Sequence, residues 1–141
     1  MIIKFKPLHP DAVAPSKAHT TDAGFDLVCT SVIEDRRHNC VSYGTGLAIE
    51  IPLGHVGLVF PRSSVYKEDI DLTNCVGVID SGYRGEILMK YRILQPHIHR
   101  YSVGDRIGQI IILPYPDIEF VESVELSDSD RGANGYGSTG R

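Results

Sequence analysis

The strongest constraint on the fold is the way glycine and proline punctuate the chain. Fourteen glycines and eight prolines interrupt a sequence of 141 residues, and no stretch between them keeps a helical period. The apolar residues instead fall into runs of about five to eight residues between turn signals. These runs read GLAIEI, HVGLVF, CVGVI, EILMKYRI and RIGQIIIL. Short apolar segments of this kind predict an all-β sandwich or barrel.

One segment departs from this pattern. SSVYKEDI, residues 63–70, follows Pro61 and Arg62 and predicts a turn or two of helix. Ser63 or Ser64 would be a favourable N-cap, because a serine hydroxyl accepts a hydrogen bond from a free backbone N–H of the first turn. We therefore expect one short helix within the all-β fold.

Length, charge and cysteine usage limit the classes of function. A chain of 141 residues suits one domain, and we divide it into a β-domain at 1–126 and a flexible C-terminal arm at 127–141. The net charge of -4 argues against a protein whose main task is binding nucleic acid. No apolar run is long enough to cross a membrane. Cys29, Cys40 and Cys75 are typical of reduced thiols, so we expect a cytoplasmic protein.

The most informative local unit is NCVGVIDSGYRGEI, residues 74–87. An apolar strand reaches Asp80, Ser81 and Gly82 would form a two-residue loop, and a second strand would leave through Tyr83. This hairpin would place Asp80 and Tyr83 opposite each other, so that a carboxylate and an aromatic ring share one pocket wall. The alternative is a polar turn in which the aspartate only solvates the loop.

Three further segments carry polar groups at positions that suit a binding site. FPRSS places Arg62 and two hydroxyls at the start of the expected helix, where free backbone N–H groups favour an anion. GQIIIL places the amide of Gln109 beside a strongly apolar strand. TDAGFDL sets Asp22 and Asp26 around Gly24. Each signal is weak when it is taken alone.

Taken in order, the segments resemble the five motifs of the trimeric deoxyuridine triphosphatases, the dUTPase family. AGFDL resembles the first motif, PRSS the second, NCVGVIDSGYRGEI the third, GDRIGQIII the fourth and RGANGYGSTG the fifth. The motif sequences are most similar to those of bacterial and bacteriophage members. The resemblance implies a distorted jelly-roll β-barrel and a homotrimer with active sites shared between subunits. It also implies hydrolysis of dUTP to dUMP and pyrophosphate with Mg²⁺.

The resemblance gives the third motif the chemistry and the specificity. Asp80 would be the general base that activates a water to attack the α-phosphorus. Tyr83 would pack against the deoxyribose and exclude a ribose hydroxyl, and Asn74 would help to position the water and the base. The backbone between Asn74 and Tyr83 would bind the edge of uracil.

The resemblance assigns the triphosphate and the metal to other motifs. Arg62, Ser63 and Gln109 would contact the phosphates. Asp26 would lie near the triphosphate and reach the metal through water. Mg²⁺ would be held mostly by phosphates and waters, so no protein cage is expected.

The sequence HIH superficially offers a different metal site. Its two histidines, His97 and His99, stand next to no evident third ligand, and zinc sites need three or four. We therefore interpret HIH as part of a loop.

The glycine-rich segment at 131–141 would close over the nucleotide from a neighbouring subunit. Tyr136 would stack on uracil and Arg131 would meet the terminal phosphate, while Ser138 and Thr139 would add hydroxyl and backbone contacts. A P-loop is the rival interpretation of this glycine cluster, but the chain has no GK[ST] sequence.

The chain departs from the family's usual residues at Ser64, Gly82, Gly108, Asn134 and Tyr136. None of these departures removes a group that the reaction requires. A dCTP deaminase of the same fold is the enzyme alternative, although deaminases lack the RGANGYGSTG ending. A second alternative is a dUTPase that also binds a regulatory protein through VCTSVIEDRRHNC.

Overall fold

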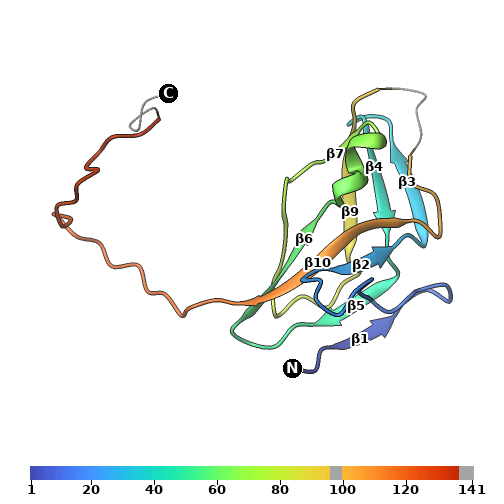
Figure 1. The fold of residues 1–141 in the computed structure, drawn as a ribbon, viewed down its shortest axis with the longest axis horizontal. Coiled ribbons are helices and arrows are strands. Elements are labelled where there is room, and N and C mark those ends of the chain that lie inside the picture. Colours follow the sequence, from blue (N-terminus) through green and yellow to red (C-terminus); the bar gives the residue numbers. More distant parts are fainter. Residues whose placement is uncertain (96–99, 137–141) are drawn as a thin grey trace.

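The computed structural model describes residues 1–95 and 100–136, and the regular secondary structure in these ranges is almost entirely β-strand (Figure 1). The strands are β1 (Lys4–Pro7), β2 (Phe25–Val28), β3 (Ser31–Asp35), β4 (Cys40–Gly44), β5 (Leu47–Glu50), β6 (His55–Phe60), β7 (Ile70–Leu72), β8 (Gly77–Ile79), β9 (Leu88–Ile93) and β10 (Arg106–Pro114). A short 3-10 helix, η1 (Ser63–Lys67), connects β6 to β7. The prediction of an all-β fold with one short helix is confirmed.

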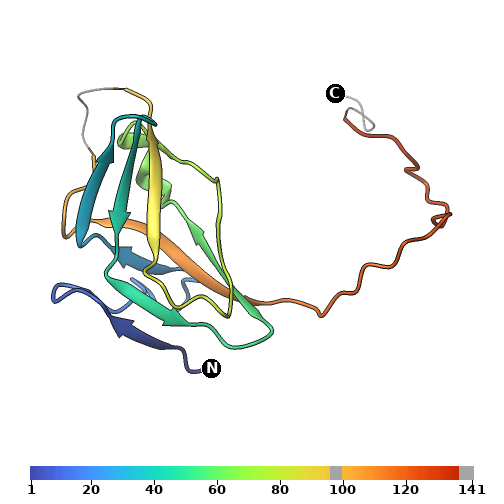
Figure 2. The ribbon, with the colours of Figure 1, turned by 180° about the vertical axis from the view of Figure 1, so that it is seen from behind.

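The strands form three antiparallel sheets. One four-stranded sheet has the order β2-β10-β6-β8, a second has the order β3-β4-β9-β7, and β1 pairs with β5. Figure 2 shows β3, β4 and β9 side by side, with β10 crossing behind them. The hydrophobic core takes side chains from both four-stranded sheets, among them Leu27, Val59, Ile107 and Ile110 from the first and Val41, Tyr43, Met89 and Tyr91 from the second. The core therefore lies between the two sheets, as in a sandwich.

Three tyrosines join the sheets at one end of this core. The rings of Tyr43, Tyr91 and Tyr101 meet edge to face with centroids 5.6, 5.8 and 6.0 Å apart. The Tyr91 hydroxyl on β9 donates a hydrogen bond of 2.6 Å to the carbonyl of Ile107 on β10. Burial raises the pKa of Tyr43 to about 12, because the ionised form would lose its hydration.

The 3-10 helix η1 begins at Ser63, so its N-cap lies before both of the predicted serines. Arg62 is the N-cap of η1 and makes no side-chain cap bond, so the prediction of Ser63 or Ser64 as N-cap is wrong. Arg62 still has the extended backbone of the strand that precedes it, with φ of -80° and ψ of 156°. The serines consequently lie inside the first turn, where their backbone is already helical.

The chain leaves the sheets after β10. The N–H of Tyr115 donates to the carbonyl of Gly54 at 3.0 Å, and the described residues beyond it form no strand. They follow an extended path away from the body (Figures 1 and 2), and Phe120, Val124 and Tyr136 are almost fully exposed. The predicted division between domain and arm after residue 126 stays a prediction.

The cysteines form no disulfide with one another. Cys29 and Cys40 are buried as free thiols, and Cys75 is exposed with a positive φ of 59°. Among the described residues, none of the helices has the length and apolar character needed to span a membrane.

Candidate active site

Two predicted phosphate contacts, Arg62 and Gln109, and the predicted indirect metal residue Asp26 are brought together across the sheet β2-β10-β6. Asp26 of β2 is opposite Gln109 of β10, and Gln109 is opposite Phe60, the last residue of β6. Arg62 follows Phe60 by two residues at the same end of β6. The antiparallel register thus gathers the first, second and fourth motifs at one place.

The carboxylate of Asp26 lies between two arginines. Its Oδ1 accepts a hydrogen bond from Arg62 Nε at 3.1 Å, and its Oδ2 accepts one from Arg106 Nη1 at 3.0 Å. The Asp26 side chain is only 17% exposed, whereas the Arg106 side chain is 51% exposed. The carboxylate therefore orients both guanidinium groups, and the N–H groups that it does not use can reach an anion.

Asp26, Arg62 and Arg106 form what we call the arginine cluster. The sequence analysis did not predict Arg106 as one of its members. It lies three residues before Gln109, and in a regular strand that spacing puts two side chains on opposite faces. A register shift between Arg106 and Gly108 interrupts the pairing of β10 with β2. The extra residue restores Arg106 to the face of Asp26. Only the occurrence of arginine inside GDRIGQIII pointed to it, because the bulge cannot be read from alternation.

Gln109 is held by its surroundings before any ligand arrives. Its Nε2 donates a hydrogen bond of 3.1 Å to the carbonyl of Pro61. Gly24 lies against the same amide, because a Cβ atom at position 24 would overlap Gln109 Oε1 and approach its Cδ to 3.0 Å. The glycine of AGFDL therefore leaves space for the amide of the fourth motif.

A polar hollow of about 420 Å³ adjoins this cluster. Arg62, Ser64, Arg100 and Arg106 contribute to its lining. Ser63, the predicted phosphate contact, is exposed at the first position of η1. The structure thus places Ser63 beside Arg62, at the end of β6 that lies next to Gln109 and Asp26.

The third motif forms a separate hollow. The N–H of Tyr83 donates to the carbonyl of Asp80 at 3.0 Å, which closes the turn through Ser81 and Gly82. Asp80 and Tyr83 line a hollow of about 180 Å³ together with Val78, Ile79, Glu86 and Leu88. The prediction that a carboxylate and an aromatic ring share one pocket wall is confirmed.

The predicted hairpin itself is wrong in its second strand. Within the described part of the chain β8 pairs only with β6, and residues 84–87 have no strand pairing before β9 begins at Leu88. β9 then belongs to the other four-stranded sheet. Neither Ser81 nor Gly82 has the positive φ of a primed turn, so the turn does not fold β8 back on itself.

Asn74 and Asp80 lie at opposite ends of β8. Asn74 belongs to the turn that precedes the strand, and Asp80 follows its last residue, Ile79. Gly77 is opposite Val59, so Asn74 lies near the end of β6 that leads to Arg62. Within one chain the structure therefore brings Asn74, and not Asp80, toward the arginine cluster.

The same register measures the gap between Asp80 and the arginine cluster. Ile79 is opposite Gly57, so Asp80 lies beside Val56, near the start of β6. The four steps from Val56 to Phe60 alone span about 13 Å, at the usual strand rise of about 3.3 Å per residue. Arg62 lies beyond Phe60, so Asp80 and Arg62 of one chain lie in two separate places.

The described part of the fifth motif, residues 131–136, lies away from the sheets (Figure 1). Arg131 Nε donates to the carbonyl of Asn134 at 3.0 Å, and Tyr136 is fully exposed. Ser138 and Thr139 lie outside the described residues, as do His97 and His99. Among the described residues, no group of three or more His, Cys, Asp or Glu side chains could hold a metal ion.

Comparisons with known proteins agree with this arrangement of motifs. Residues 11–140 match the family model of dUTPase. The chain is 43% identical over 143 residues to a deoxyuridine 5'-triphosphate nucleotidohydrolase of Corynebacterium glutamicum, covering 99% of this chain and 95% of the relative.

Solved structures agree as well. A Staphylococcus bacteriophage 80alpha dUTPase variant with dUpNHpp has a TM-score of 0.83 at 29% identity, over 99% of both chains. A dUTPase variant from phage phi11 of S. aureus, described with a structural Mg(II) ion, has a TM-score of 0.74 at 26% identity, over 91% of this chain and 100% of that one. The predicted jelly-roll-like fold is confirmed.

Proposed function

We propose that this protein, which belongs to the dUTPase family, hydrolyses dUTP to dUMP and pyrophosphate in the cytoplasm. The row of Asp26, Gln109 and Arg62 across one sheet is the observation that carries the proposal. In this row Arg62, oriented by Asp26, and Gln109 supply donors for a triphosphate. The turn from Asp80 to Tyr83 supplies a carboxylate and an aromatic ring in one hollow.

The phosphates would be bound by groups that the fold already orients. Arg62, fixed by Asp26, would present its Nη groups to the phosphate oxygens. Gln109, held against Pro61, would add a neutral amide, and Ser63 would add a hydroxyl. Because these groups need little reorganisation, their electrostatic stabilisation of charge developing on the phosphates would be effective.

Asp80 would take the proton of the water that attacks the α-phosphorus. Its carboxylate lies in a turn that is closed by the Tyr83 N–H, so its backbone is fixed. Asn74 would help to position that water. The backbone between Asn74 and Tyr83 would bind uracil, and the ring of Tyr83 would pack against the deoxyribose.

The donors of this chain fit a magnesium ion that is bound chiefly by the substrate. Both carboxylate oxygens of Asp26 already accept hydrogen bonds from arginines, which leaves them suited to a metal-bound water rather than to direct coordination. Mg²⁺ retains several waters and commonly binds through substrate phosphates. When bound, it would neutralise charge on the triphosphate.

A complete site would need more than one chain, because Asp80 and Arg62 of one chain are separated by most of β6. We infer a homotrimer in which the Asp80 turn of one subunit faces the arginine cluster of a second. The fifth motif of a third subunit would cover the nucleotide with Tyr136, Arg131, Ser138 and Thr139. The described residues of the arm, 127–136, are exposed, and this supports the inference.

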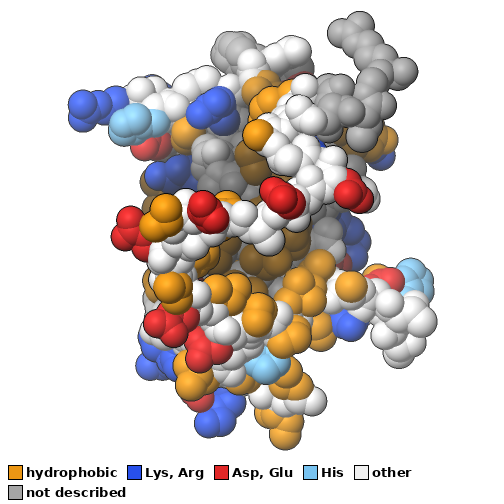
Figure 3. All heavy atoms as spheres, turned by 90° about the vertical axis from the view of Figure 1, so that its left-hand side faces the viewer, with side chains coloured by type: hydrophobic (Ala, Val, Ile, Leu, Met, Phe, Trp, Pro, Cys, Tyr) orange, Lys and Arg blue, Asp and Glu red, His pale blue; other side chains and the backbone are white. Residues whose placement is uncertain are grey.

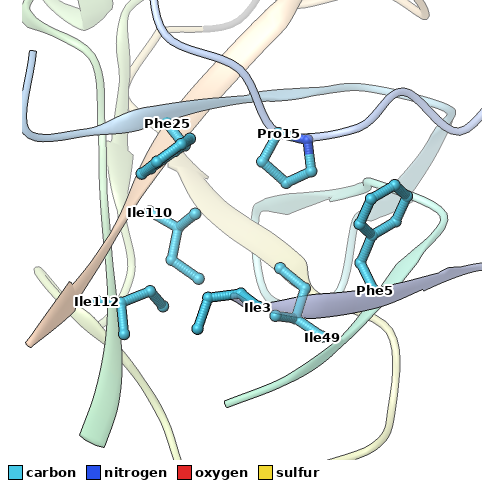
Figure 4. A pocket seen from close by; sticks show the side chains of 7 residues that line it. All are labelled: Ile3, Phe5, Pro15, Phe25, Ile49, Ile110 and Ile112. Carbon is cyan, nitrogen blue, oxygen red and sulfur yellow. The ribbon is translucent and has the colours of Figure 1, made fainter. Parts of the chain in front are cut away.

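Apolar surface on the single chain also supports association. An apolar hollow of about 170 Å³ is lined by Ile3, Phe5, Pro15, Phe25, Ile49, Ile110 and Ile112 (Figure 4). Figure 3 shows a broad hydrophobic area on the side toward which the arm extends, below a row of acidic side chains. Apolar surface of this kind commonly marks an interface.

The test is the substitution Asp80→Asn, which keeps the shape of the side chain and removes the base. We expect pyrophosphate release from dUTP to fall by at least about 100-fold, while binding of a non-hydrolysable dUTP analogue persists. Asp71→Asn is the matched control, because Asp71 is an exposed aspartate on β7 outside the site. Assays with dCTP, dTTP and UTP give the substrate class, and ammonia release from dCTP would instead indicate a deaminase. Near-parental turnover by the Asp80→Asn variant would contradict the assignment of the base.

A further inference from the structure

We propose that Gly85 and Glu86 are positioning residues that fix the ring of Tyr83 and thereby set the discrimination between deoxyribose and ribose. This inference rests on the proposed function, because it concerns the sugar-facing ring of the same site. Neither residue is itself expected to touch the reacting atoms. Both act through the tyrosine.

The ring of Tyr83 lies directly on the backbone of Gly85. A Cβ atom at position 85 would lie 2.6 Å from Cζ and 2.9 Å from Cε2 of that ring, and it would overlap the hydroxyl oxygen. Gly85 does not have a positive φ, so its backbone conformation is open to any residue. The glycine is therefore required for space and not for backbone freedom, and the space that it leaves is filled by the tyrosine.

The tyrosine is held at both of its ends. Its hydroxyl donates a hydrogen bond of 2.9 Å to the carbonyl of Glu86, and its backbone N–H donates one of 3.0 Å to Asp80. Tyr83 is nevertheless 43% exposed as a residue, and its side chain lines the hollow that it shares with Asp80. An exposed tyrosine normally keeps rotational freedom, and these contacts remove it before a nucleotide binds.

Glu86 connects this contact to the core. Its Oε1 accepts a hydrogen bond of 2.7 Å from the backbone N–H of Gly46, at the corner between β4 and β5. The next residue, Ile87, is fully buried, and its N–H donates to Leu47 at 2.8 Å. The carbonyl of Ile87 also accepts a hydrogen bond of 2.9 Å from the buried Thr45 hydroxyl. The Tyr83 hydroxyl thus rests on a segment that cannot shift without disturbing the core.

A ring fixed in this way excludes an extra hydroxyl on the sugar by steric contact. A ring that is displaced or free to rotate would leave room for the 2′-hydroxyl of a ribonucleotide. We therefore expect Gly85→Ala to lower the ratio of kcat/KM for dUTP to kcat/KM for UTP by about tenfold or more. Most of the change would appear as a higher kcat/KM for UTP and not as a lower kcat/KM for dUTP.

A double-mutant cycle separates positioning from a general effect on the fold. Tyr83→Ala removes the ring, so adding Gly85→Ala to that variant would leave the dUTP to UTP ratio unchanged if Gly85 acts through the ring. An equal loss of ratio in both backgrounds would overturn the inference. So would a Gly85→Ala variant that keeps the parental ratio.

Glu86 provides the matched pair of substitutions. Glu86→Gln keeps an oxygen that can accept from the Gly46 N–H, and we expect it to keep the parental ratio. Glu86→Ala removes that anchor and should lower the ratio, as Gly85→Ala does. Equal ratios for Glu86→Ala and the parent would contradict the role of Glu86. Thermal unfolding of each variant shows whether it remains folded.

The activity of the parent protein distinguishes a failure of the proposed function from a failure of the positioning inference. If it releases no pyrophosphate from dUTP, the proposed function fails and this inference fails with it. If the parent is active and the Gly85→Ala ratio is unchanged, only the positioning inference fails.

Discussion

At the scale of single residues, Gly108 and Met89 form a matched pair in the core. Gly108 is buried on β10, and a Cβ atom there would overlap Sδ and Cε of Met89 and approach the carbonyl oxygen of Phe60 to 2.9 Å. Met89 is 1% exposed. The side chain of the methionine thus occupies the volume that a larger residue at position 108 would need.

We expect Gly108→Ala to destabilise the protein by about 1–3 kcal/mol, because the added methyl group would overlap the side chain of Met89. Met89→Val in the same chain should recover part of this loss, although Met89→Val alone would leave a cavity. Urea unfolding of the four chains measures the coupling. Additive effects of the two substitutions, or a Gly108→Ala chain as stable as the parent, would contradict the pairing.

The same scale shows what a sequence can and cannot give about the site. Asp26, Arg62 and Gln109 were predicted from their chemistry and motifs, and the register does gather them. Arg106 was missed because a bulge reverses its face. The roles of Gly24 and Gly85 were also hidden, since each depends on a side chain that only the folded structure brings against it.

At the scale of elements, the strands at HVGLVF and RIGQIIIL were predicted nearly residue for residue. Their apolar runs are long and their ends carry clear turn residues. The hairpin at 74–87 failed because local pattern does not say which sheet the chain enters next. The hydrogen bonds of Ile87 with Leu47 and Thr45 draw the segment away from β8, toward the corner between β4 and β5.

The arm is the other element whose place the sequence alone leaves open. Its described part beyond Tyr115 has no strand pairing, and Tyr136 is fully exposed. Deleting residues 131–141 should therefore leave the melting temperature within a few degrees of the parent, because the described residues of this segment, 131–136, are exposed and outside the core. Turnover of dUTP should fall by at least about 100-fold, since closure over the nucleotide would be lost. A truncated chain with full turnover would show that the arm has no part in the reaction.

At the scale of the whole molecule, the separation of the two hollows decides how many chains make one site. The sandwich places the arginine cluster at the end of β6 and the Asp80 turn beside its start. No rearrangement of side chains closes a gap of about 13 Å or more, because β6 itself spans it. Under the proposed function, a second subunit would therefore supply the other half of the site.

This separation predicts that two inactive chains restore each other. Asp80→Asn and Arg62→Ala should each be nearly inactive alone. If every site takes Arg62 from one subunit and Asp80 from another, unfolding and refolding an equal mixture should recover about one quarter of the parental turnover, because both intact residues then meet in about one site in four. The measurement is pyrophosphate release from dUTP after refolding, with circular dichroism to show that each variant is folded. A mixture of Asp80→Asn with Asp80→Ala is the control, because it contains no intact Asp80 and should stay inactive. If the first mixture also stays inactive while its chains assemble together, Arg62 and Asp80 act within one chain, and the shared site is excluded.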